Sequence, residues 1–110
     1  MALQINDARE LNAKAAEAAR LLTALANKHR LAILCELIES ERSVGALAQA
    51  VGLTQSALSQ HLSKLRAAGI VATRRDAQTI YYRLASAAAG RIMKALADIY
   101  CGSRPRKVSL

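Results

Sequence analysis

Short uncharged polar side chains gather along one segment of this 110-residue chain. Glutamine and serine donate and accept hydrogen bonds without a fixed charge. Glutamine can pair with adenine, and serine with several base edges, so this chemistry suits the floor of the DNA major groove. The candidate base-contacting residues are Gln55, Ser56, Ser59, Gln60 and Ser63.

An apolar stripe in the same segment indicates the element that carries these side chains. Leu58, His61, Leu62 and Leu65 recur at the spacing of one helix face, and the Ser/Gln residues fall on the opposite face. The alternative is an ordinary amphipathic helix with a solvated polar face. Solvated faces usually favour Glu and Lys, which form helices better than Ser does, so a contact surface is the preferred interpretation.

The residues before this helix predict a helix-turn-helix unit. A short helix over 45–51 leads into a tight turn over 51–53, and Thr54 begins the second helix, which Gly69 ends. Such a unit places its second helix in the major groove.

The residues after Gly69 predict a β-hairpin. Residues 70–75 and 79–84 are expected to be strands joined by a turn over 76–78. A hairpin directly after a recognition helix is the wing of a winged helix-turn-helix. Arg74, Arg75 and Gln78 lie near its tip, where they could reach phosphates or the minor groove. The alternative is a solvated hairpin whose arginines only aid solubility.

Composition limits the class of protein. With 16 Lys and Arg against 8 Asp and Glu, the net charge is +8 and the pI is about 10.2, which favours a polyanionic partner such as DNA over other ligands. An acidic membrane surface would also attract this charge, but no apolar run approaches the roughly 18 residues of a membrane span. No signal peptide is evident, so a cytoplasmic location is expected. An enzyme is not expected, because no nucleophile lies beside a base and no phosphate-binding loop is present.

The rest of the chain predicts one domain, residues 1–110, with an ordered core over about 7–101 and a basic tail over 102–110. Further helices are expected over 7–26, 27–39 and 86–101, with caps at Asn27 and Ser43. The first and last helices carry apolar stripes that one small domain cannot cover, so a homodimer is expected to present two recognition helices to two half-sites. The stripes comprise Leu11, Ala15, Ala18, Leu22 and Leu25, and Ala88, Ile92, Ala95, Leu96 and Ile99.

This arrangement resembles the ArsR/SmtB family of bacterial repressors over roughly residues 10–101. The segments that carry the resemblance are 26–34, 55–62, 65–70 and 75–82. It implies a mainly α winged helix-turn-helix fold, with four helices, two hairpin strands and a last helix. It also implies a dimer that binds an inverted repeat in a double-stranded DNA operator and leaves it when an inducer binds. A non-specific architectural protein, or an activator that displaces a nucleoid protein, would use the same surface.

The resemblance raises the question of the inducer. Many relatives sense metals through a Cys-x-Cys pair near the first helix of the motif, or through Asp and His on the last helix. Here 43–52 lacks Cys and 86–101 lacks His, and neither His29 nor His61 has neighbours at metal-ligand spacing. No metal site and no cofactor are expected.

Cys35 and Cys101 remain as candidates for the inducer site. From the residues alone, they are two unrelated small apolar side chains in a reduced compartment. However, Leu34-Cys35-Glu36-Leu37 and Ile99-Tyr100-Cys101 resemble the two cysteine settings of the BigR/SqrR-type branch of the family. That resemblance implies a redox-sensing pair that reactive sulfur species bridge. A metal-responsive repressor and a general oxidant switch are the alternatives.

Overall fold

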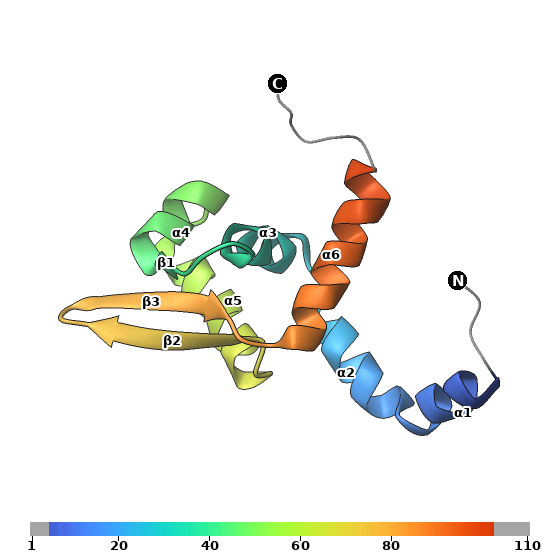
Figure 1. Cartoon of the computed structure of the whole chain (residues 1–110). Coiled ribbons are helices and arrows are strands. Elements are labelled where there is room, and N and C mark those ends of the chain that lie inside the picture. Colours follow the sequence, from blue (N-terminus) through green and yellow to red (C-terminus); the bar gives the residue numbers. More distant parts are fainter. Residues whose placement is uncertain (1–4, 103–110) are drawn as a thin grey trace.

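The computed structural model describes residues 5–102 (Figure 1). The regular structure in this part of the chain is helical except for three strands. The elements are α1 (Ile5–Ala13), α2 (Ala15–Leu25), α3 (Lys28–Leu37), β1 (Arg42–Ser43), α4 (Val44–Val51), α5 (Gln55–Ala67), β2 (Val71–Asp76), β3 (Thr79–Leu84) and α6 (Ala87–Cys101). The predicted winged helix-turn-helix is therefore confirmed, with α4 and α5 as the helix-turn-helix. The predicted basic tail lies outside the described residues from 103 onward.

The N-terminal region differs from its prediction as one helix over 7–26. The chain bends at Lys14, whose φ and ψ are −109° and 20°, so α1 and α2 lie at an angle (Figure 1). The Lys14 N–H is shared between the carbonyls of Glu10 at 3.2 Å and Leu11 at 3.0 Å, which tightens the last turn of α1. No Gly or Pro marks this bend, so the local sequence carries no signal for it.

Side-chain caps set the starts of four helices, as their residue types favour. Asn27 accepts hydrogen bonds from the backbone N–H groups of His29 and Arg30. Ser43 begins α4, Thr54 begins α5 and Ser86 begins α6 in the same way. The helix predicted to run to Glu39 is shorter in the structure, where α3 ends at Leu37.

A third strand joins the predicted hairpin. β2 and β3 pair antiparallel from Val71↔Leu84 to Asp76↔Thr79, and β1 pairs with the other edge of β3 through Arg42↔Tyr82 and Ser43↔Tyr81. The sequence predicts no strand at residues 42–43. A two-residue strand has no periodicity of its own, and only its distant partner makes it extended.

One apolar core joins the helix-turn-helix to the wing base and to α6. Leucines dominate it, with Met93 and Ala89 from α6. The buried residues are Leu25, Ile33, Leu34, Leu37, Leu47, Leu58, Leu62, Leu65, Ile70, Val71, Ala89 and Met93. Within residues 5–102, none of the helices combines the length and apolar character that crossing a bilayer requires.

Candidate DNA-binding surface and thiol pair

The recognition helix α5 has the two faces that its sequence predicts. Leu58, Leu62 and Leu65 are buried in the core. The opposite face is open to solvent along its length. Its exposed side chains are Gln55, Ser56, Ser59, Gln60 and Ser63. The structure therefore brings all five predicted base-contacting residues onto one accessible surface.

Glycines end both helices of the helix-turn-helix. Gly52, at the turn between α4 and α5, has a φ of +68°, and its N–H donates to the Ala48 carbonyl at 3.0 Å. Gly69, just past α5, has a φ of +75°, while the Ile70 N–H donates to the Leu65 carbonyl at 2.9 Å. Glycine adopts this left-handed backbone without the steric cost of a Cβ, which explains both positions.

His61 lies at the edge of the buried stripe, as predicted. Its ring is 5.6 Å from that of His29, and its Nδ1 is buried with no hydrogen-bond partner within residues 5–102. Burial, followed by the charges of Arg30, His29 and Lys64, lowers the pKa of His61. The neutral ring therefore joins α3 to α5.

The two wing arginines lie on opposite faces of the hairpin. Successive strand residues alternate in direction, so Arg74 shares a face with its partner Tyr81, and Arg75 shares the other face with Ile80. Arg75 is exposed and has no hydrogen bond or ion pair within the described part of the chain. The pairing of β2 with β3 thus places Arg74 and Arg75 on different faces, although the sequence analysis gave both the same role.

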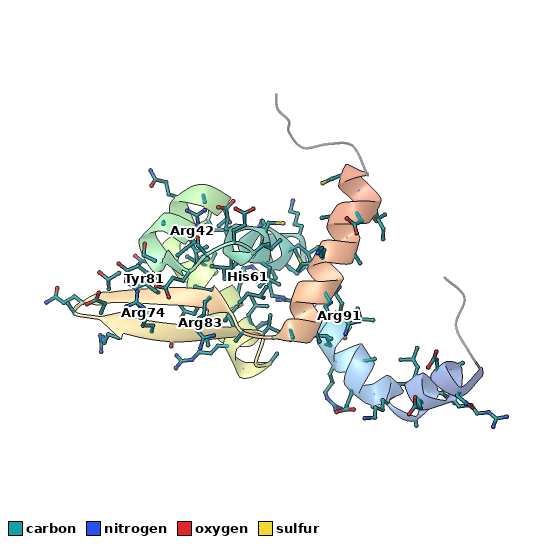
Figure 2. The ribbon with its side chains drawn as sticks, in the orientation of Figure 1. Arg42, His61, Arg74, Tyr81, Arg83 and Arg91 are labelled. Atoms are coloured by element: carbon teal, nitrogen blue, oxygen red, sulfur yellow. The ribbon has the colours of Figure 1, made fainter. Side chains whose placement is uncertain are left out.

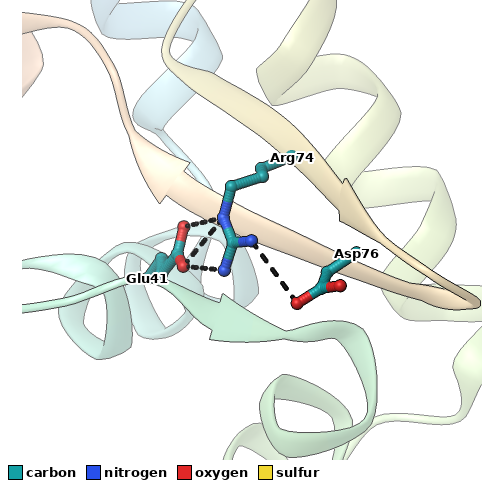
Figure 3. Close-up of polar contacts among 3 residues, drawn as sticks. All are labelled: Glu41, Arg74 and Asp76. Carbon is teal, nitrogen blue, oxygen red and sulfur yellow. Dashed lines mark hydrogen bonds and ion pairs between the residues drawn. The ribbon is translucent and has the colours of Figure 1, made fainter.

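Arg74 lies in a cluster with Glu41 and Asp76 (Figure 3). Its Nε donates to the two Glu41 carboxylate oxygens at 3.1 and 3.2 Å, a further hydrogen bond runs from Nη2 to Glu41, and Nη1 is 3.8 Å from Asp76 Oδ2. Its guanidinium also stacks on Tyr81, 4.6 Å from the ring centre (Figure 2). The hydrogen bond to Arg74 lowers the pKa of Glu41 and raises that of Arg74. Sequence reasoning missed Glu41, because nothing in its local pattern indicates a partner on the wing.

A hollow joins the wing to the start of the recognition helix. Gln78 from the hairpin turn and Gln55 from α5 both line it, together with Ser43 and Gly45 near the start of α4. Two residues predicted separately as DNA contacts therefore open onto the same space.

The two cysteines come from α3 and α6, which pack against each other. Both thiols are free, Cys35 is exposed and Cys101 is half-buried. Partial burial, then the charge of Glu36, then Cys101 raise the pKa of the Cys35 thiol. The packing of these two helices therefore places the two thiols on neighbouring elements of the fold. Their separation in the sequence gave no indication of this.

Apolar side chains remain uncovered on the outer helices. Leu11 and Leu22 are 55% and 54% exposed, and Ile99 on α6 is 67% exposed. Three members of the predicted stripes differ. Leu25 is only 3% exposed and belongs to the core, and Ile92 and Leu96 are half-buried and pack against it. Residues 5–102 contain no group of three His, Cys, Asp or Glu side chains that could hold a metal ion.

The fold and this surface define a transcriptional regulator of the winged helix-turn-helix class, in which α5 is the recognition helix. Residues 27–73 match the family described as "Bacterial regulatory protein, arsR family". The chain belongs to this family, whose members are DNA-binding regulators and not enzymes. They bind DNA operators, typically as dimers.

Known members support this assignment along most of the chain. The nodulation protein NolR of Rhizobium meliloti is 63% identical over 83 residues, which are 76% of this chain and 68% of that protein. The solved structure of the repressor BigR from Xylella fastidiosa is 43% identical, with a TM-score of 0.82 over 86% of this chain and 97% of that chain. A structure described as reduced HlyU from Vibrio cholerae is 46% identical, with a TM-score of 0.79 over 84% and 98% of the two chains.

Proposed function

We propose that this regulator is a homodimeric repressor that leaves its operator when reactive sulfur species bridge Cys35 and Cys101. The observation that carries the proposal is the packing of α3, which holds Cys35, against α6, which holds Cys101. Cys35 is exposed and reaches solvent-borne oxidants directly. One related solved structure is described as reduced HlyU, so a redox state is specified for that protein.

The proposed DNA surface combines α5 and the wing. We expect the Ser and Gln side chains of α5 to contact base edges, and Arg75 and Gln78 to contact phosphates or the minor groove. Arg74 faces the other side of the wing and is held by Glu41. Its main role is therefore to orient the wing, and a direct contact with DNA would require its release from Glu41.

The proposed dimer uses α1, α2 and α6. Their exposed Leu11, Leu22 and Ile99 side chains would leave water on association. A two-fold axis through these helices would present two α5 helices to an inverted repeat.

The proposed bridge forms by sulfur transfer. One cysteine thiolate attacks the outer sulfur of a persulfide RSSH, which gives Cys–SSH and releases RS⁻. The second thiolate attacks the inner sulfur of Cys–SSH, closes a disulfide and expels HS⁻. The thiols supply two protons, so the sum is two Cys–SH and RSSH giving the disulfide, RSH and H₂S. If both cysteines are first converted to Cys–SSH, attack by one on the other expels HS⁻ and leaves three sulfurs in the bridge.

The bridge would act on DNA through the core. α3 packs against both α5 and α6, so a covalent link between α3 and α6 constrains the helix that supports α5. To release DNA, the bridged dimer must bind the operator less well than the reduced dimer. A hundredfold loss of affinity corresponds to about 2.7 kcal/mol.

Mass spectrometry of the dimer after treatment with glutathione persulfide tests this proposal, with glutathione disulfide and hydrogen peroxide as parallel oxidants. We expect a Cys35–Cys101 crosslink after persulfide alone, with one or more extra sulfurs where both cysteines were first converted to Cys–SSH. The same plain disulfide from every oxidant would replace the proposal with a general redox switch. No crosslink from any oxidant would overturn both.

A further inference from the structure

A groove beside Cys35 carries charged groups of both signs. Its walls are the end of α3 with the two residues that follow it, β1, the end of β3 and one side of α6. The residues that carry the argument are Cys35, Glu36, Glu39, Arg42, Gly90 and Lys94. The apolar residues Ile38, Leu84 and Ala97 also line it, so the groove is an open space of mixed character with a thiol in its wall.

The α6 wall leads from this groove towards the second thiol. Gly90, Lys94, Ala97 and Cys101 follow one another at steps of four, three and four residues, so they fall on one side of the helix. Gly90 and Ala97 are small, and the Leu84 side chain lies beside Gly90. A molecule in the groove would lie alongside Cys35 with Cys101 at the next turn of α6.

The charges in the groove divide into a paired set and an unpaired set. Arg42 Nη2 is 4.0 Å from Glu36 Oε1, and Arg42 Nε donates to the Glu36 carbonyl at 3.2 Å. The side chains of Glu39 and Lys94 make no hydrogen bond or ion pair within residues 5–102, and both residues are exposed. The groove therefore offers one ammonium and one carboxylate group to a ligand.

We propose that this groove binds the organic part of the sulfur donor, and that the preferred donor is a zwitterionic amino-acid or short-peptide persulfide. Its carboxylate pairs with Lys94, its ammonium pairs with Glu39, and its outer sulfur meets the thiol of Cys35. This inference rests on the proposed function and adds the identity of the donor. The sulfur transfer is the one written above, and the RS⁻ that leaves is the zwitterionic thiol.

Two charge-removing variants and two donors test the groove. The rate of bridge formation is measured with glutathione persulfide and with an uncharged alkyl persulfide, in Lys94→Gln and Glu39→Gln. Lys64→Gln, an exposed lysine on α5, is the matched control. We expect both groove variants to slow the reaction of glutathione persulfide about three- to fivefold, the size that exposed charge pairs produce. The uncharged donor should react equally with all four proteins.

The signs of these effects make the test decisive. If Glu39→Gln speeds the reaction of glutathione persulfide, its carboxylate repels the donor and the proposed ammonium contact is wrong. Equal slowing of both donors would mean that the variants disturb the thiols and not a binding site. Thermal melting of each variant confirms that it is folded before its rate is interpreted.

A binding measurement separates this inference from the function on which it rests. S-methylglutathione cannot transfer sulfur, so its titration followed by amide shifts reports the groove alone. We expect saturable shifts along α6 that weaken in Lys94→Gln. Absent shifts, with bridging by both donors, would overturn the groove and leave the thiol switch standing. Binding without bridging by either donor would overturn the thiol switch and keep the groove as a site for zwitterionic peptides.

Discussion

The recognition surface on α5 and the thiol pair between α3 and α6 differ in how their side chains are placed. The α5 surface is made of neighbours along one helix, so the helical repeat alone puts Gln60 and Ser63 on a common face. The thiols belong to helices that are far apart in the sequence, and only the packing of α3 against α6 places Cys35 and Cys101 on neighbouring helices. The first region needs only local structure, whereas the second requires the whole core.

This difference bears on how each region can change. Side chains on the α5 surface are exposed and can be exchanged without disturbing Leu58 or Leu62 beneath them. Cys35 can respond to Cys101 only while the core holds α3 and α6 in place. The proposed DNA contacts are therefore separable one by one, and the proposed switch works only as a pair.

Loss of either thiol should have the largest effect. We expect Cys101→Ser to abolish a roughly hundredfold persulfide-induced loss of operator affinity, which corresponds to about 2.7 kcal/mol. The affinity of the untreated protein should stay the same, because the α5 surface is unaltered. Fluorescence anisotropy with a labelled operator measures both states, and Cys35→Ser should behave identically. A single-cysteine variant that still releases DNA would contradict the pairwise character of this region.

Removal of one amide on the recognition surface should have the next largest effect. Gln60→Ala is expected to cost about 1–3 kcal/mol of discrimination between the operator and a single-base variant, the usual worth of a bidentate base contact. Competition binding with the two duplexes measures the ratio. Gln49→Ala, an exposed glutamine on α4, serves as the control and should leave the ratio unchanged. Equal ratios for Gln60→Ala and the unmodified protein would remove Gln60 from the base-reading set.

The two wing arginines should differ in a smaller but measurable way. Arg75→Ala should weaken binding to all duplexes about equally and reduce the slope of log affinity against log salt by about one. Arg74→Ala should change this slope less, because Glu41 already neutralises the Arg74 charge. Binding isotherms at four or five salt concentrations give the slopes. Matching slopes for the two variants would show that the faces of the wing are equivalent in binding.

Mild acid should have the smallest effect, and it should act through His61. Its pKa in the folded state lies below the ordinary value of 6.5, so below about pH 6.5 the unfolded chain binds more protons than the folded one. Stability is therefore lost as the pH falls from 6.5 towards the lowered pKa of the folded state. Melting temperatures between pH 7.5 and 5.5 should fall less in His61→Gln than in the unmodified protein. Identical falls would assign the acid sensitivity to other groups.

Much of the fold could be predicted because its signals are local. Asn27, Ser43 and Thr54 have the side chains that cap helices, and each caps one. Gly52 and Gly69 mark turns that require a positive φ. The bend at Lys14 and the strand β1 could not be predicted, because neither has a residue type or a period that distinguishes it from its surroundings.

The candidate sites also differ in how much of each could be predicted, because only local patterns are visible in the sequence. Every predicted residue of α5 lies on the exposed face, because a helix repeats regularly. Alternation along β2 could have indicated that Arg74 and Arg75 diverge, but only the position of Glu41 determines which of them is held. The groove beside Cys35 has no sequence signal, because its walls come from α3, β1, β3 and α6, which are separate in the sequence.

The sequence by itself determined the helix-turn-helix, the hairpin and the polar face of α5, since each depends on spacing over a few residues. The tertiary structure alone decided that Leu25 is buried, that Glu41 holds Arg74 and that the helices of Cys35 and Cys101 pack against each other. Local patterns follow from the geometry of one helix or strand. Contacts between distant segments depend instead on how the buried leucines of α3, α4 and α5 pack together, and no short stretch of sequence encodes that packing.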